Sequence, residues 1–180
     1  MTSSLWMALL CFVLQAPNQA PATPAKTATP TRSAILTAAR TIMANARYAT
    51  LVTINGSDPA DARIVDPFAP EDELTIWFAT NAASRKVAEL KKDRRVTLLY
   101  FDAVNKGYVT VKGTATLVTS ASEKAKRWKD EWAGMWSRKN EGDDYVLVRV
   151  DPDTIEVVSV ALGMVNDPAT WRPVTLAIKK

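Results

Sequence analysis

The segment Glu73–Lys92, ELTIWFATNAASRKVAELKK, decides the fold: it predicts a strand, a tight polar turn and a short basic helix. Apolar residues alternate from position 74 to position 78, and the β-branched and aromatic side chains among them favour a strand over Glu73–Ala79. The polar residues 80–83 break this run. Ser84 then stands where the N-cap of a helix over Arg85–Lys92 is expected.

Positive charges crowd the start of that helix. Arg85 and Lys86 fall in its first turn, where backbone N–H groups have no intrahelical acceptor and the helix dipole is already positive. A bound anion would resolve this conflict, because the helix N-terminus, both cations and the hydroxyls of Thr80 and Ser84 together form a phosphate cradle. The alternative is that both cations point into water, with Arg85 pairing with Glu89 one turn later.

Composition excludes several kinds of chemistry. The chain of 180 residues allows one domain of ordinary size, and its net charge of +4, with both signs interspersed, is a weak argument for nucleic-acid binding. It contains no His, which excludes His-based acid–base catalysis and His metal ligation. Cys11 is the single cysteine, so an intrachain disulfide and a thiolate metal cluster are excluded too, and we expect no metal site.

The N-terminal region predicts export. Leu5–Leu14 is an unbroken apolar run of ten residues, too short to span a bilayer comfortably, and small residues suited to signal peptidase follow it. We therefore expect a secretory signal peptide at 1–20 and a Pro/Ala/Thr-rich linker at 21–32, with no membrane span in the mature chain. The alternatives are a retained membrane anchor, or a start codon placed too early and a cytoplasmic protein.

The remainder predicts short strands with few helices. A helix is expected over Ser33–Arg47, with Ser33 as its N-cap, and a long helix is expected after the capping box Ser120–Glu123, with Trp128, Trp132 and Trp136 on one face. Gly113 predicts a bulge or a close backbone approach. The strands expected besides Glu73–Ala79 are Tyr48–Ile54, Ala62–Phe68, Arg95–Asp102, Tyr108–Val118, Asp144–Val150, Thr154–Val160 and a short one at Val174–Ile178, with a turn at Asp151–Asp153.

Many short strands joined by hairpin-length connections indicate an antiparallel barrel, mainly β with flanking helices (α+β). We place this domain at 33–160 and a C-terminal tail at 161–180. The order of elements resembles the FMN-binding split β-barrel of the pyridoxamine 5′-phosphate oxidase-like superfamily, and especially its bacterial general stress protein group. The motifs that carry this resemblance are Ala62–Val65, Ile76–Asn81, Ser84–Lys86, the strand pair Val96–Tyr100 and Val109–Gly113, and Trp136 before Asp144–Val150.

The resemblance implies a cofactor site. In relatives, the residues matching Arg63, Ser84, Arg85 and Lys86 hold the FMN phosphate, and the main chain around Ile64, Val65, Phe78, Ala79 and Thr80 lies along the flavin ring. The resemblance also implies a homodimer with flavin sites between the subunits, where Trp132 or Trp136 would form a wall from the partner; core packing is the alternative for both.

A departure from the family limits the expected activity. True pyridoxamine phosphate oxidases hold their substrate with an Arg-x-His pair, and this chain has no His. We therefore expect a non-covalent FMN protein, an oxidoreductase of unknown substrate without genuine pyridoxamine phosphate oxidase activity. The alternatives are a deazaflavin-dependent reductase and a module that binds flavin or another phosphorylated ligand without turnover. Nucleic-acid binding through the basic residues 124–129 is not expected, because acidic residues interleave with them.

Overall fold

The computed structural model describes residues 29–56 and 59–178. The predicted signal peptide at 1–20, Cys11 and positions 21–28 of the predicted linker lie outside these residues. Across the described part of the chain, no helix is both long and apolar enough to cross a bilayer.

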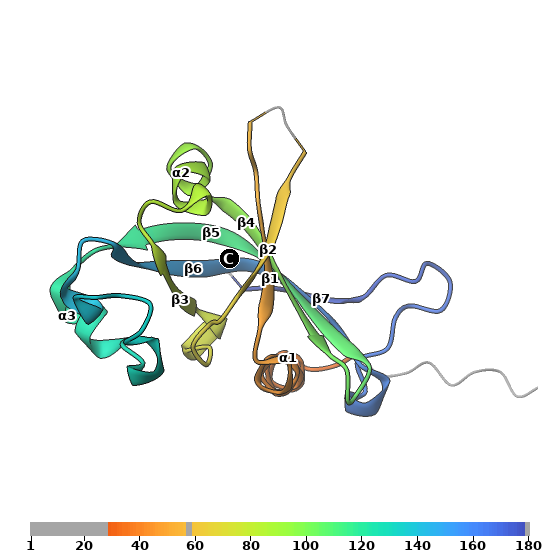
Figure 1. Cartoon of the computed structure of the whole chain (residues 1–180). Helices are drawn as coiled ribbons and strands as arrows, with labels where there is room; N and C mark the ends of the chain where they lie inside the picture. The colour runs from red at the N-terminus through yellow and green to blue at the C-terminus, as the bar shows by residue number, and fades with distance from the viewer. Residues whose placement is uncertain (1–28, 57–58, 179–180) are drawn as a thin grey trace, which may run out of the picture.

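One curled antiparallel sheet forms the body of the protein (Figure 1). Its strands run in the spatial order β2-β1-β4-β5-β6-β3, and β7 pairs with the far end of β6. The strands are β1 (Ala49–Thr53), β2 (Asp61–Val65), β3 (Ile76–Asn81), β4 (Arg95–Asp102), β5 (Gly107–Val118), β6 (Tyr145–Val158) and β7 (Val174–Ala177). The α-helices are α1 (Arg32–Ala46), α2 (Arg85–Lys92) and α3 (Ala121–Lys126), and the 3₁₀ turns are Asp72–Leu74, Asp130–Trp132, Lys139–Glu141 and Val160–Leu162.

The sheet nearly closes on itself. Its two outermost strands, β2 and β3, meet through one isolated bridge between Pro67 and Phe78, next to a hydrogen bond of 2.8 Å from Phe68 N to Trp77 O. Beyond this bridge no ladder joins β2 to β3 within the described residues. The result is the predicted split barrel, whose split lies between the strand that carries Arg63 and the strand that leads to Lys86.

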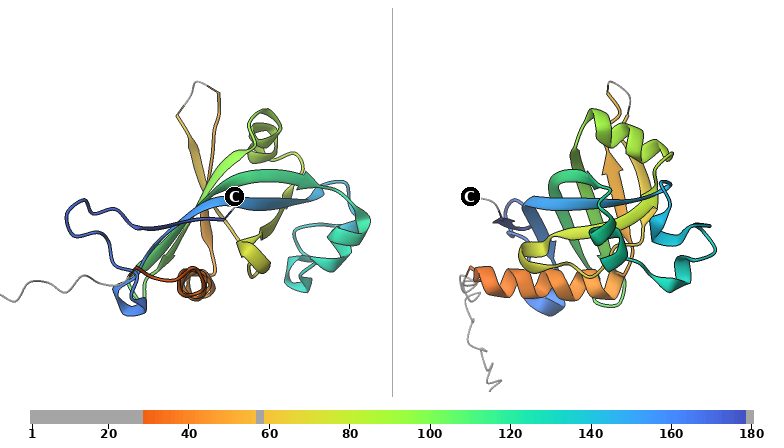
Figure 2. Two further views of the ribbon diagram at one scale, coloured as in Figure 1. Left: turned by 180° about the vertical axis from the view of Figure 1, so that it is seen from behind. Right: turned by 90° about the vertical axis from the view of Figure 1, so that its left-hand side faces the viewer.

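The main core fills the inside of the curled sheet and is closed by α1, which runs along one end of the barrel (Figure 2). Alternation along β4 and β5 directs one face of each strand inward, as the sequence predicted for a half-buried sheet. The apolar stripe of α1 covers this interior, with the buried residues Ile35, Ala38, Ala39, Ile42 and Met43. Thr31, and not the predicted Ser33, caps this helix: its hydroxyl accepts from Ala34 N.

Two predicted strand ends move, one at a proline whose effect as a strand end is local and one where the backbone turns to bury Leu74. β2 ends at Val65, since Pro67 cannot donate to a ladder and makes only its single bridge. β3 begins at Ile76 and not at Glu73, because Glu73 and Leu74 adopt positive φ angles of 51° and 60°. In this conformation Leu74 is fully buried in the core.

The predicted break between a sixth and a seventh strand was wrong. Residues 145–158 form one continuous strand, β6, through Pro152. The register against β5 shifts between Lys112 and Gly113, and this bulge accommodates the proline. Gly113 is needed there, because a Cβ atom would lie 2.4 Å from Asp151 O. The close backbone approach predicted at Gly113 is confirmed.

The long helix predicted after Ser120 was also wrong. Ser120 does cap a helix, with its hydroxyl accepting from Glu123 N, but α3 ends at Lys126. Arg127 leaves the helical conformation: its guanidinium lies 3.6 Å above the Trp77 ring and 2.5 Å from Glu71 Oε1. The hydroxyl of Tyr145 also donates to Arg127 O at 2.5 Å. These contacts outweigh the helical spacing of the Trp residues.

Candidate functional site

The turn between β3 and α2 is built by local hydrogen bonds. Asn81 Oδ1 accepts from Ala83 N at 2.8 Å, and Asn81 O accepts from Ser84 N at 3.0 Å, which reverses the chain. Ser84 is the N-cap residue of α2, as predicted, although its hydroxyl makes no capping hydrogen bond. That hydroxyl lies 3.3 Å from Thr80 Oγ1 instead. Two hydroxyls and the first turn of α2 therefore share one corner of the molecule.

Lys86 points its ammonium group into the same corner. Its Nζ donates to Thr80 Oγ1 at 2.9 Å. Partial burial of Lys86 lowers its pKa, and the nearby charges of Arg63 and Arg85 lower the pKa further, although Glu89 opposes this effect. An anion bound next to Lys86 would stabilise its charged form, which the surroundings otherwise disfavour.

Arg63 and Arg85 converge on a carboxylate on the neighbouring turn of α2. Arg63 Nη2 donates to Glu89 Oε2 at 2.8 Å, and Arg85 Nε lies 3.1 Å from Glu89 Oε1. The pairing of Arg85 with Glu89, the alternative considered from the sequence, is therefore present. Arg85 also reaches across to Asp61 Oδ1 at 2.9 Å, which ties α2 to the start of β2.

Glu89 is buried, with 3% of its side chain exposed, and is held by more than the two arginines. Thr53 Oγ1, on β1, donates to Glu89 Oε2 at 2.5 Å and accepts from Arg63 Nη1. Burial alone would raise the pKa of Glu89, but the hydrogen bond from Thr53 and the charge of Arg63 outweigh this, and the pKa lies below its ordinary value. Glu89 is therefore a buried anion at neutral pH.

The structure brings most of the predicted site residues together. Arg63, Thr80, Ser84, Arg85 and Lys86 surround one corner at the split. Ile64 and Val65 lie on β2, whereas Phe78 and Ala79 lie on β3, so the two strands that were predicted to line a flavin ring face each other beyond the Pro67–Phe78 bridge. Their backbone edges along the split are free of a common ladder, which leaves N–H and C=O groups available to a ligand.

Trp136 lies elsewhere. It is buried among the side chains of Trp77, Trp132, Tyr145 and Leu147, and its ring centroid is 5.1 Å from that of Tyr145. This is the core-packing alternative considered from the sequence; a role for Trp136 toward a partner's ligand stays a prediction. Ala79 packs against the same aromatic cluster, which therefore supports β3 from the side away from the main core.

Three residues of the site were not predicted as members. Thr53 and Asp61 lie on β1 and β2, which the sequence did not place beside α2, and Glu89 was considered only as a surface partner of Arg85. The sequence could have indicated that Glu89 belongs to the site, because Glu89 precedes Leu90 and so lies at the edge of the buried face of α2.

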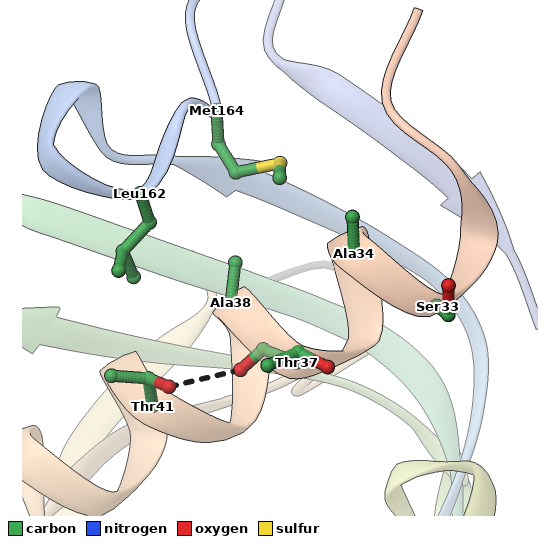
Figure 3. A pocket seen from close by; sticks show the side chains of 7 residues that line it. All are labelled: Ser33, Ala34, Thr37, Ala38, Thr41, Leu162 and Met164. Atoms are coloured by element: carbon green, nitrogen blue, oxygen red, sulfur yellow. Dashed lines mark hydrogen bonds between the residues drawn. The ribbon is translucent and has the colours of Figure 1, made fainter.

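Two shallow hollows elsewhere on the protein do not fit a phosphate. Figure 3 shows the larger one, of about 340 Å³, between α1 and the segment carrying Leu162 and Met164. No charged side chain lines it, and the Thr41 hydroxyl already donates to Thr37 O at 3.0 Å. The other, of about 270 Å³, lies beside Pro67 and Phe68 and has Arg47 as its single charged lining residue.

A curled antiparallel sheet that closes through one bridge, with cations and hydroxyls gathered at the opening, defines a split-barrel protein. The family model described as pyridoxamine 5′-phosphate oxidase (PNPOx_N) matches residues 35–159. The chain therefore belongs to the pyridoxamine 5′-phosphate oxidase family, as the resemblance of its motifs indicated. Among curated proteins, none matches the sequence.

Solved structures share the fold. General stress protein 26 from Bacillus anthracis is 24% identical with a TM-score of 0.58, over 70% of this chain and 92% of that one. A protein related to general stress protein 26 from Clostridium acetobutylicum reaches a TM-score of 0.67 at 14% identity, over 80% and 94% of the two chains. A pyridoxamine 5′-phosphate oxidase-related, FMN binding protein from Nostoc punctiforme is 15% identical with a TM-score of 0.52, over 83% and 97%.

Proposed function

We propose that this protein binds FMN non-covalently at the split and works as a flavin-dependent oxidoreductase. The observation that carries the proposal is the ammonium group of Lys86, half-buried beside the hydroxyls of Thr80 and Ser84 at the N-terminus of α2. These groups offer an anion a charge, two hydroxyl donors and unpaired backbone N–H groups. A FMN binding protein among the structures that share the fold supports the choice of ligand.

The residues fit the rest of the cofactor as well. A flavin ring is flat and mostly apolar with a polar edge, and the two strand edges at the split supply apolar side chains together with backbone donors and acceptors. When bound, the flavin supplies hydride or electron transfer, so the protein needs no acid–base pair of its own. The part played by the chain is to hold the phosphate and to orient the ring along β2 and β3.

We also propose that the protein forms a homodimer through the outer face of β1, β2 and β4. Ile64 is 66% and Phe101 62% exposed on this face, and Leu99 is exposed as well. Ile64 on β2 and Leu99 on β4 both lie opposite Thr50 on β1, and Phe101 lies on the same face of β4 as Leu99, so the apolar side chains of β2 and β4 flank Thr50 on one face of the sheet. Exposed apolar patches of this kind mark protein contacts. Ile64 and Arg63 are successive residues of β2 and point to opposite faces of the strand, so a second copy on the outer face would be separated from the candidate site by β2.

The test of the cofactor is titration of the full chain with FMN and with riboflavin, followed by absorbance. We expect bound-flavin absorbance with FMN and much weaker binding of riboflavin, because the cations recognise the phosphate. Equal affinity for the two would refute the proposal. Bleaching by a reduced nicotinamide and recovery in air would identify an oxidoreductase that takes electrons from this donor, whereas a bound flavin that keeps its colour would exclude this donor and leave the binding module as one alternative. A deazaflavin phosphate, titrated in parallel, tests the other cofactor.

The test of the assembly is light scattering at micromolar concentration. We expect the mass of a dimer for the native chain and a shift toward the monomer for Phe101→Asp, which would bury a charge in the interface. A monomer with FMN fully bound would contradict this part of the proposal.

A further inference from the structure

The charges at the corner do not act equally on an anion. Three cations, Arg63, Arg85 and Lys86, face two carboxylates, Glu89 and Asp61, which leaves one net positive charge. Arg63 is ion-paired with Glu89, and Arg85 with both carboxylates. Lys86 forms no ion pair within residues 29–56 and 59–178, and its direct partner is the neutral hydroxyl of Thr80.

Arg63 is held in place as well as neutralised, whereas Arg85, with 68% of its side chain exposed, is ion-paired only. Arg63 has both terminal nitrogens engaged: Nη2 on Glu89, and Nη1 on the Thr53 hydroxyl and on Asp61 O at 3.2 Å. Glu89 Oε2 accepts hydrogen bonds from Arg63 and Thr53. Its Oε1 lies close to Arg85 without a well-directed hydrogen bond. The carboxylate therefore occupies, among the cations, the position that an anion would otherwise take.

We propose that Glu89 is the resident anion of the cation cluster: it positions Arg63 and pairs with Arg85 in the empty protein, and it weakens the hold of the site on a phosphate. This inference rests on the proposed function, since it concerns the same site. According to this inference, Lys86 is the main residue that attracts the phosphate of the ligand, together with Thr80 and Ser84. The two arginines contribute less, because Glu89 pairs with them and fixes where Arg63 lies.

The consequence is a variant that binds better. Glu89→Gln keeps the shape of the side chain and an acceptor oxygen for Thr53 and Arg63, but it removes one negative charge from the corner. A unit charge about 4 Å from another charge changes affinity roughly fivefold even in the dielectric of water, and the change is larger in a partly buried site, so tenfold is a low estimate here. We expect FMN to bind about tenfold more tightly to Glu89→Gln than to the native chain, with riboflavin affinity unchanged.

The empty protein should respond in the opposite direction. Without the carboxylate, Arg63, Arg85 and Lys86 repel one another around a buried position, so the melting temperature of Glu89→Gln without ligand should fall. Glu141→Gln is the matched control, because Glu141 is exposed and forms no ion pair in the described residues. We expect this control to leave both the melting temperature and the FMN affinity unchanged.

The experiment compares the native chain, Glu89→Gln and Glu141→Gln by titration with FMN, riboflavin and inorganic phosphate, and by melting without ligand. Weaker or unchanged FMN binding in Glu89→Gln, while the native chain still prefers FMN over riboflavin, would overturn the role of Glu89 alone. A native chain without that preference would overturn the proposed function. If the native chain shows no such preference, the melting temperatures without ligand still test Glu89. Equal melting temperatures for Glu89→Gln and the native chain would then overturn the inference that Glu89 positions Arg63.

Discussion

Replacement of Lys86 by alanine gives a sharp test of the site. Lys86 is the cation of the corner without an ion pair in the described residues, and its charge is already disfavoured by burial and by Arg63 and Arg85. Removing it deletes a charge-assisted hydrogen bond to the phosphate, a loss of about 1.5–3 kcal/mol of binding free energy. The dissociation constant for FMN should therefore rise roughly ten- to hundredfold.

Two further measurements separate this effect from a general loss of structure. Riboflavin affinity should be unchanged by Lys86→Ala, because riboflavin lacks the phosphate. The melting temperature of the empty variant should be unchanged or raised, since two neighbouring cations lose a repulsive partner at a helix N-terminus. Lys91→Ala, on the exposed last turn of the same helix, is the control and should bind FMN normally. An equal loss for FMN and riboflavin, or no loss for FMN, would refute the assignment of the phosphate to Lys86.

Three other predictions address stability and processing. Gly113→Ala should destabilise the fold by about 1–3 kcal/mol in urea unfolding, because its methyl group would meet the backbone of β6 at Asp151; Gly134→Ala, where nothing lies within 4 Å, should cost far less. The pKa of Glu89 is lowered from 4.5 in the folded state, so its contribution to stability is complete above pH 4.5 and is lost as the pH falls through its lower native pKa. Glu89→Gln should therefore weaken the fall in stability at acid pH. An unchanged fall would contradict the charged state of Glu89. N-terminal sequencing of the native protein should start between about Ala20 and Lys26 if the predicted signal peptide is cleaved, whereas an intact Met1 in the cytosol would exclude export.

Much of the fold could be predicted from local sequence patterns. The alternation in Arg95–Asp102 and in the strand after Gly107, and the amphipathic spacing of Arg85–Lys92, are properties of neighbouring residues, and these elements were predicted to within a residue. The cations at the start of α2 were visible for the same reason. What could not be read from spacing was which distant groups meet them: Thr53 and Asp61 reach Glu89 and Arg85 only because β1 and β2 lie beside α2.

The errors at α3 and β6 have a common physical origin, which is that tertiary contacts override local preference. Arg127 belongs to a run with helical spacing, yet stacking on Trp77 and pairing with Glu71 hold it in another conformation. Pro152 is a turn signal by its own chemistry, but the shift of register opposite Gly113 lets the strand continue through it. Neither outcome follows from residues that are adjacent in the sequence.

The uninterrupted course of β6 has a consequence for engineering of this protein. Its first half pairs with β3 next to the candidate site, and its second half pairs with β7, from Thr154 opposite Ala177 to Val157 opposite Val174. A chain shortened at residue 160 would retain the whole family match and yet expose the second half of β6 as a bare, β-branched strand edge, the usual template for edge-to-edge aggregation. β7 therefore covers this strand edge and protects the protein from aggregation, so a shortened form of the protein should retain β7.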